Sequence, residues 1–594
     1  MTDRFGIRAT WMLGRMLSGL LTFGTLLILF YERWLSIKSL KRRVKRLIGR
    51  DPGKLNPTQA VKFRNETKER RAEARTWESQ FDDAMSQQAT QNPFDENKDT
   101  IFLVVTSGQA VRLILLTDVI ERLKARFNVV IISQYSNNPA FVKEHGGKGV
   151  HLLPWFEKFK SRIGNVFQYY LMERSGSATH RDWLANLESR SPGQEALHGF
   201  RTGHRRFDSH AKARKFSNAL GAVFGARGLL HLYHAFLLSY LPRRILRRLF
   251  DRYRPCAVIS TSSHHISAWP LTFFGRQSGI ETLAYVISWD NCTTKVTLDP
   301  YCSSYAVWSE EMAEELHRCC PYVSARTFVV GSPLFDMYYR DDLLLDRRDF
   351  LKSLKLPEDR PYIVYATNTP AAMPDEPDLI ADYWDALSRT LLAGKVSLLV
   401  RLHPADDIER YEALRQRPGL AITLANEGSE QGIEAWIPTR KNMSLLLNTI
   451  KHASVSVNVA STMSLESFAA GVPTINVGFR ARPEIREKFL WRFAMYHTSE
   501  HYRALIDNGA VEVARNLDEL VAMTRDVLEG TTDRREAMTK TLLQKAGFHD
   551  GASAGRLSDL MVTIGTRNAG FAAVRSPAIQ KSSMAERSHS VPGT

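Results

Sequence analysis

Residues 452–479 constrain the fold more than any other segment, because they combine two strand patterns with a short helix between them. Residues 454–459 alternate polar and β-branched side chains, as a half-buried strand does. Apolar residues then recur at helical spacing as far as Gly471, a residue type that commonly ends helices, and residues 473–477 begin a second apolar strand. A strand–helix–strand unit of this kind places its two strands parallel in one sheet.

The loop between the first of these strands and the helix, residues 460–463, is a candidate binding site. Parallel sheets bind ligands beyond the carboxyl ends of their strands, and helix starts offer free N–H groups to phosphates. Ser461 or Thr462 can cap the helix, and Thr462 and Glu466 lie one turn apart, away from the apolar stripe. These side chains suit the phosphate and ribose of a nucleotide. They are also ordinary caps and dipole partners of helices, so this segment alone leaves both interpretations open.

Polar residues follow two further strands in the same half of the chain. Thr367 and Asn368 come after a buried strand at residues 362–366, and Arg401 and His403 end the next one. A cation and an imidazole at a strand end are suited to an anionic diphosphate. Because parallel strands share one carboxyl edge, we expect these side chains to lie near the loop just described.

The first half of the chain has its own strands with polar ends. The strand at residues 256–261 leads to His264, and the strand at residues 283–287 leads to Asp290, with Lys295 close behind. His264 or Asp290 could act as a general base. A structural histidine and a capped turn at Asp290 are equally open interpretations.

No bound cofactor or metal is predicted. The single Gly108 after the strand at residues 101–105 is not a dinucleotide fingerprint, and fits a tight turn as well as an acceptor site. Five cysteines occur without a Cys-x-x-Cys pair, which fits a reducing cytosol and argues against zinc. A nucleotide-activated donor would therefore be a substrate that binds a cationic site.

The charge balance and the N-terminus predict attachment to a membrane. The chain has 80 Lys and Arg against 63 Asp and Glu, an excess that suits anionic lipid or nucleic acid. Residues 16–31 are uncharged, and extension back to Ala9 gives a spanning length of about 20 residues. The basic run at residues 38–50 should stay in the cytoplasm, which predicts an inner-membrane protein with cytoplasmic catalytic domains. A helix lying in the membrane plane is the rival interpretation, and no nucleic-acid module is recognised.

A second basic segment, residues 243–250, sets arginine pairs beside apolar residues on a predicted helix. This pattern fits a solvated face, or contact with the membrane surface or with an anionic lipid-linked substrate.

The predicted fold class is α/β, with two Rossmann-like βαβ domains facing across a cleft and an N-terminal membrane helix. The predicted units are an anchor with its basic segment, a helical spacer, an acceptor domain, a nucleotide-donor domain and a disordered tail, at residues 1–55, 56–97, 98–340, 341–565 and 566–594.

Two motifs carry a resemblance to a known family. Residues 401–404, Arg-Leu-His-Pro, resemble the His-Pro element of bacterial capsule and teichoic-acid-type transferases, including those that use CDP-glycerol. The Ser461…Glu466…Gly471-Val-Pro pattern is similar to the donor motif of many GT-B glycosyltransferases.

The resemblance implies that His403 contacts the donor phosphates, Ser461 and Thr462 the diphosphate, and Glu466 the ribose. It also suggests residues 426–428 for the nucleotide pocket. No Asp-Asp-Gly triplet of the sialyltransferase-like pattern occurs in the first domain, so the base stays open.

The predicted function is that of a membrane-associated glycosyltransferase, which moves a sugar from a nucleotide-activated donor to a lipid-linked or polysaccharide acceptor of the cell envelope. Three alternatives remain: a polyol-phosphate transferase of the CDP-glycerol type, a non-hydrolysing sugar-nucleotide epimerase, and a basic protein that binds nucleic acid without catalysis.

Overall fold

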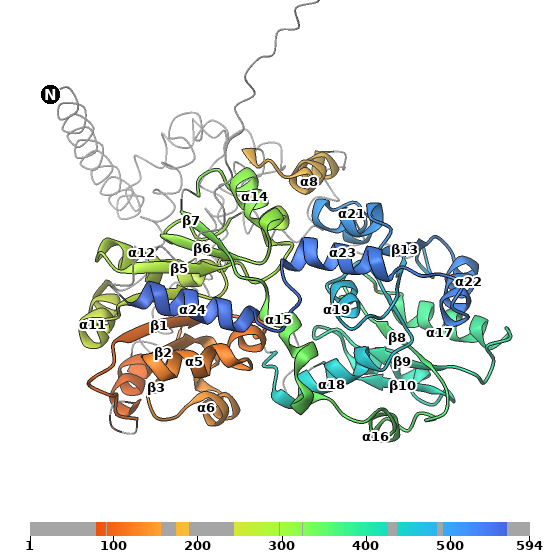
Figure 1. Ribbon diagram of the computed structural model, residues 1–594, viewed down its shortest axis with the longest axis horizontal. Helices are drawn as coiled ribbons and strands as arrows, with labels where there is room; N and C mark the ends of the chain where they lie inside the picture. The colour runs from red at the N-terminus through yellow and green to blue at the C-terminus, as the bar shows by residue number, and fades with distance from the viewer. Residues whose placement is uncertain are drawn as a thin grey trace, which may run out of the picture.

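The structure is a computed structural model (Figure 1), which describes residues 79–88, 90, 92–155, 174–188, 243–295, 297–323, 325–425, 436–483 and 491–566. The predicted membrane segment, the basic run at residues 38–50, the predicted nucleotide-pocket residues 426–428 and the tail lie outside these ranges. Within them, no helix is long and apolar enough to cross a bilayer.

The first sheet has seven parallel strands in the order β3-β2-β1-β4-β5-β6-β7. Their bounds are β1 (Thr100–Val105), β2 (Asn128–Ser133), β3 (Val150–Pro154), β4 (Ala257–Ser260), β5 (Glu281–Tyr285), β6 (Ser304–Val307) and β7 (Arg326–Val329). Both faces of the sheet are covered, because alternate residues of β1 join two different apolar clusters. Ile101 and Leu103 belong to one cluster, and Phe102 and Val104 to the other. Such two-sided burial explains why these strands read as continuous apolar runs.

The second sheet has six parallel strands in the order β10-β9-β8-β11-β12-β13. Their bounds are β8 (Tyr362–Ala366), β9 (Ser397–Arg401), β10 (Leu420–Thr423), β11 (Val455–Asn458), β12 (Thr474–Val477) and β13 (Val511–Ala514). Strand order reverses between β1 and β4 in the first sheet, and between β8 and β11 in the second. These reversals are the switch points at which doubly wound sheets bind ligands. The prediction of two parallel α/β sheets is confirmed.

Helices connect the strands and cover the sheets (Figure 1). Those that precede the second sheet are α5 (Asp118–Arg126), α6 (Pro139–His145), α8 (Ala178–Glu188), α11 (Arg243–Tyr253), α12 (Trp269–Gln277), α13 (Asn291–Thr294), α14 (Glu310–Cys319) and α15 (Pro333–Asp336). The helices of the second half of the chain are α16 (Arg347–Ser353), α17 (Glu376–Leu387), α18 (Arg440–Lys451), α19 (Met463–Ala469), α20 (Trp491–Tyr496), α21 (Glu500–Asp507), α22 (Leu517–Leu528), α23 (Arg535–Ala546) and α24 (Ser553–Gly565).

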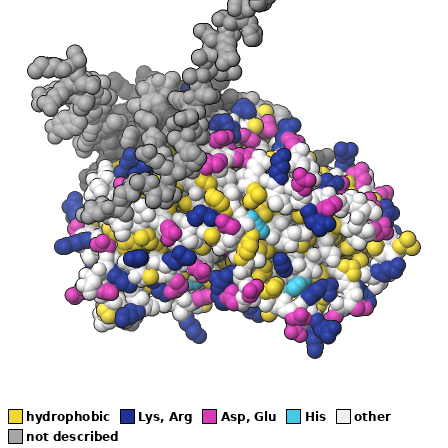
Figure 2. Space-filling model, in the orientation of Figure 1, with side chains coloured by type: hydrophobic (Ala, Val, Ile, Leu, Met, Phe, Trp, Pro, Cys, Tyr) yellow, Lys and Arg dark blue, Asp and Glu magenta, His cyan; other side chains and the backbone are white. Residues whose placement is uncertain are grey.

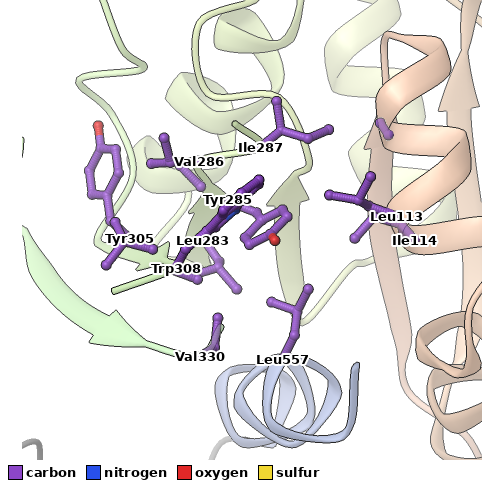
Figure 3. Close-up of a cluster of buried hydrophobic side chains, with 14 of the residues drawn as sticks. Leu113, Ile114, Leu283, Tyr285, Val286, Ile287, Tyr305, Trp308, Val330 and Leu557 are labelled. Carbon is purple, nitrogen blue, oxygen red and sulfur yellow. The ribbon is translucent and has the colours of Figure 1, made fainter. Parts of the chain in front are cut away.

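The last helix, α24, returns to the first sheet. It packs on α5 and β5, and Figure 3 shows Leu557 of α24 beside Leu283 of β5 and Val330, the residue after β7. The predicted second unit, residues 341–565, therefore ends in a helix that belongs to the core of the first.

The helix expected after β1 is interrupted. The short helix α4 (Gly108–Ala110) passes into a π-helical turn, η2 (Val111–Leu115), and this turn ends before α5 begins. A π turn carries an extra residue per turn and is frequent at functional sites.

The basic helix α11 buries its apolar side in the protein. Ile245, Leu246 and Leu249 are at most 1% exposed and join the cluster under β1, so these residues are not available to a bilayer. Arg244 and Arg247 are exposed on the other side of the helix. On the face shown in Figure 2, basic and acidic side chains of the described residues are intermingled, so no large basic patch for nucleic acid is visible there.

Candidate functional site

The carboxyl ends of three neighbouring strands of the second sheet converge at one edge. Ala366, the last residue of β8, pairs with Arg401 of β9 on one side and with Asn458 of β11 on the other. The loops after these strands are tied together: the His403 N–H donates to Thr367 Oγ1 at 2.8 Å, and Asn368 Nδ2 donates to the carbonyl of Val459, next to the Ser461 loop, at 3.2 Å. The predicted donor-site residues of this half thus lie at one switch point.

His403 is held as a neutral hydrogen-bond donor. Its Nδ1 accepts from the Ala405 N–H at 3.0 Å, so the ring proton lies on Nε2. Burial lowers the pKa of His403 to about 4, although nearby Asp406 acts in the opposite direction. At pH 7 the ring therefore offers an Nε2–H to a ligand oxygen and contributes no positive charge. Of the cation and the imidazole expected at this strand end, only Arg401 is charged.

Arg401 lies beneath this edge, where only 6% of the residue is exposed. Its guanidinium donates to the carbonyl of Leu424 at 3.0 Å and so fastens the chain after β10 to the end of β9. Its positive charge lies within the domain, below the loops.

The Ser461 loop is fixed by a buried polar network. Asn458 Oδ1 accepts from the Ser461 N–H and the Ser464 hydroxyl, both at 3.2 Å, from the Ser461 hydroxyl at 3.3 Å, and from Asn476 Nδ2 at 3.2 Å. The Tyr502 hydroxyl is 2.7 Å from both Ser464 Oγ and Asn476 Oδ1. Four elements thereby hold one loop in one conformation.

The network constrains a strained backbone. Ala460 has φ +38°, in the left-handed region that side chains other than glycine avoid. Such a conformation costs roughly 1–3 kcal/mol and persists where surrounding contacts over-determine it, which is common at binding sites. Ser461, rather than Thr462, caps the following helix, since its hydroxyl accepts from the Met463 N–H at 3.2 Å.

The first domain contacts the second through residues that follow β5 and β1. Trp289, which follows β5, donates its indole N–H to Thr462 Oγ1 at 3.1 Å, and His501 of α21 packs edge-on against the same indole with ring centroids 4.9 Å apart. Gly108 lies against Trp436, and a Cβ at Gly108 would be 2.4 Å from the Trp436 carbonyl oxygen. Glycine is required there by close approach of the second domain, a role the sequence did not suggest.

Glu466 is buried against the first domain, with 3% of the residue exposed. Its carboxylate receives two hydrogen bonds from the Arg112 guanidinium, at 2.6 and 3.3 Å, and one from the Tyr338 hydroxyl at 3.4 Å. The side of the helix expected to face a ligand therefore faces another part of the chain.

The two predicted base candidates, Asp290 and His264, lie at the carboxyl edge of the first sheet and differ in charge at pH 7. Asp290 accepts from the hydroxyls of Ser288 and Thr294. Burial raises its pKa, but Lys295, His501 and these hydroxyls outweigh burial and hold the pKa below its usual value.

His264 packs edge-on against His265 and has its Nδ1 buried without a hydrogen-bond partner among the described residues. Burial, followed by His265 and Lys295, lowers its pKa well below the usual value. The ring is neutral at pH 7, and Asp290 is a fixed carboxylate that orders its own turn.

Several site residues were not predicted from the sequence, namely Arg112, Trp289, Tyr338, Asn458, Asn476 and Tyr502. Asn476 carried a usable signal, because it interrupts the apolar strand at residues 473–477, whereas Asn458 is one of the polar positions of an alternating strand. Both are 0% exposed in the structure. Arg112 carried none, since its partner lies 354 positions away. Within the described residues, no group of three or more His, Cys, Asp or Glu side chains is arranged to hold a metal ion.

No protein-family model matches the chain, and no curated protein matches it. Among solved structures, the S. aureus MnaA–UDP co-structure is similar with a TM-score of 0.44 and 8% identity, over 78% of this chain and 96% of that chain. A glycosyltransferase from Rickettsia africae ESF-5 is similar with a TM-score of 0.42 and 9% identity, over 80% of this chain and 100% of that chain. MurG from Acinetobacter baumannii is similar with a TM-score of 0.37 and 12% identity, over 78% of this chain and 99% of that chain. At these values the likeness identifies no activity, and the chemistry rests on the chain's own residues.

Proposed function

We propose that this protein is a membrane-associated glycosyltransferase of the GT-B type, which transfers a sugar from a nucleotide-activated donor to a lipid-linked or polysaccharide acceptor of the cell envelope. One observation carries the proposal: Thr367, His403 and Ser461 meet at the switch point of the second sheet, on loops that hydrogen bonds tie together. A parallel sheet binds its ligand at this place, and the neutral His403 ring offers its Nε2–H to a phosphate oxygen.

On the donor side, His403 Nε2–H and the Ser461 loop would hold the diphosphate, and Glu466 the ribose. Thr367 and Asn368 act on the loops: Thr367 Oγ1 accepts from the His403 N–H, and Asn368 bonds to the strand end at Val459. Arg401 adds a fixed positive charge beneath them. A preorganised set of donors stabilises the charge that develops on a departing nucleoside diphosphate.

On the acceptor side, His264 is the base we favour, because its ring is neutral at pH 7 and lies after β4, at the carboxyl edge of the first sheet. It would take the proton of the acceptor hydroxyl as that oxygen attacks the sugar carbon. The bond between that carbon and the donor phosphate oxygen then breaks, and the nucleoside diphosphate leaves with the electron pair. Asp290 would position the neighbouring turn.

Membrane attachment is part of the proposal and rests on sequence. The uncharged run at residues 16–31 and the basic run at residues 38–50 would anchor the chain at the inner membrane, with both sheets in the cytoplasm. Exposed Arg244 and Arg247 of α11 would add attraction to anionic headgroups.

The test is a panel of UDP-, GDP-, CMP- and CDP-linked donors, added to the full-length protein in detergent, with thermal stabilisation as the readout. A stabilising donor whose effect is lost in His403→Ala and Glu466→Ala, together with sugar transfer to a lipid-linked acceptor, is the expected result. Preference for a CDP-polyol would identify a polyol-phosphate transferase, and conversion of a UDP-sugar without acceptor an epimerase. Undiminished stabilisation in both variants would refute the site.

A further inference from the structure

The ion pair between Arg112 and Glu466 joins the two domains directly at the proposed donor site. Arg112 lies in the π-helical turn η2 after β1, and Glu466 lies in α19 after β11. The side chains are 10% and 4% exposed, so the pair is shielded from water and salt. Removal of either partner alone would leave the other charge buried and uncompensated, which is strongly destabilising.

The pair occupies both oxygens of the Glu466 carboxylate. Arg112 Nη2 binds Oε2 at 2.6 Å and Nη1 binds Oε1 at 3.3 Å, the two-pronged arrangement that guanidinium and carboxylate prefer. Tyr338 OH adds a third donor to Oε2 at 3.4 Å. A ribose diol binds a carboxylate in the same way, with one hydroxyl on each oxygen. Arg112 and a ribose diol therefore compete for the same two atoms.

We infer that Arg112, a residue of the first domain, controls access of the donor's ribose to Glu466 in the second. The inference rests on the proposed function, because it needs a nucleotide at this edge. When the site is empty the pair holds the two domains together, and a nucleotide binds only after the pair has opened. Donor affinity is then reduced by the fraction of molecules in which Glu466 is uncovered.

Nothing else in the described surroundings of Arg112 replaces Glu466 as an anionic partner. Among the described residues, its other hydrogen bond runs from Nη2 to the sulfur of Met337 at 3.5 Å, and its Nε is buried without a hydrogen-bond partner. Separation of the pair thus leaves Arg112 uncompensated until the domains move apart and water reaches it.

The decisive variant is Arg112→Met, which keeps an unbranched apolar side chain beside Met337 but cannot bind the carboxylate. Affinities for UDP, CDP and GDP, each with its 2′-deoxy form, are measured by calorimetry on the full-length protein. We expect the ribonucleotide that binds wild type to bind Arg112→Met about tenfold more tightly, as if about a tenth of wild-type molecules were open. The 2′-deoxy form should gain less, because one hydroxyl needs only one carboxylate oxygen.

Two further variants keep the test sharp. Arg112→Lys retains the charge but cannot bind both oxygens at once, so it should give a smaller gain, and it decides the question if Arg112→Met does not fold. Arg318→Met is the matched control: it removes another ion pair between the domains, that of Arg318 with Glu500, and leaves Glu466 untouched. Its nucleotide affinity should equal that of wild type.

The outcomes separate this inference from the proposed function. Equal or weaker ribonucleotide binding by a folded Arg112 variant would overturn the competition and leave the nucleotide site standing. An equal gain in Arg318→Met would overturn it as well, since general loosening would then explain the effect. If wild type and every variant bind none of the nucleotides, both proposals fail.

Discussion

Asn458 offers the sharpest test of how the candidate site is built. It is 0% exposed, and its side-chain oxygen accepts four hydrogen bonds, three at 3.2 Å and one at 3.3 Å. In Asn458→Leu the acceptor disappears while its donors stay. Ser464 keeps its bond to Tyr502, and the Asn476 amide keeps longer bonds to the Asn458 backbone carbonyl at 3.4 Å and to Ser464 Oγ at 3.5 Å, so the main group left unpaired is the Ser461 N–H. At about 1–3 kcal/mol for a buried unpaired group, the free energy of unfolding should fall by about 1–3 kcal/mol.

The matched control is Ser456→Ala, two residues earlier on the same strand. Ser456 is also 0% exposed, but its hydroxyl has no hydrogen-bond partner among the described residues, so its removal should change stability by less than about 0.5 kcal/mol. Urea titrations of wild type and both variants give the comparison through the shift in midpoint at unchanged slope. If Asn458→Leu costs no more than Ser456→Ala, the network does not hold the loop and the reasoning is wrong.

Three other perturbations have outcomes fixed by the structure. Burial raises the pKa of Glu376 from its ordinary value of 4.5 to about 8, so the unfolded chain loses this proton first and the free energy of unfolding should fall as pH rises from about 4.5 to 8. Glu376→Gln should flatten this fall between pH 6.5 and 8 in thermal melts, and an unchanged slope would contradict the assignment. Trp289→Phe removes the hydrogen bond to Thr462 and keeps an aromatic ring, so nucleotide affinity measured by calorimetry should change, while the free energy of unfolding measured by urea titration should fall by only about 1 kcal/mol. An unaltered affinity would count against the contact. His264→Gln should lower the transfer rate by roughly 10²–10⁴-fold and leave nucleoside diphosphate affinity unchanged, and an undiminished rate would remove His264 as the base.

Most strands whose residues are buried could be predicted from the sequence, but β3, which is buried along its whole length, was not. The strands at β1, β2, β4, β5, β8, β9, β11 and β12 were found within about two residues of their expected bounds. Strands β3, β10 and β13 were not predicted. The last two are sheet edges with partly exposed residues, as in the pattern of Val511–Ala514, so their apolar signal is weaker.

For the candidate site, the sequence predicted the position of residues near the strand ends but not their contacts with distant parts of the chain. Polar residues after consecutive strands located His403 and Ser461 at one edge, because strand ends in a parallel sheet must share an edge. The state of those residues depended on distant parts of the chain. Glu466 was expected to face a ligand, and it faces Arg112, whose position is set by the packing of one domain on the other. The neutral state of His403 likewise follows from burial, which a sequence does not display.

The most direct measurement of the central claim is photocrosslinking with an azido-substituted nucleoside diphosphate, followed by mapping of the labelled peptides by mass spectrometry. The claim is that the carboxyl edge of the second sheet, between His403 and residues 459–466, holds the donor nucleotide. Labelled peptides from these two segments, competed away by unmodified nucleotide, are the predicted result. Competable labelling confined to the first sheet or to α11 would contradict it.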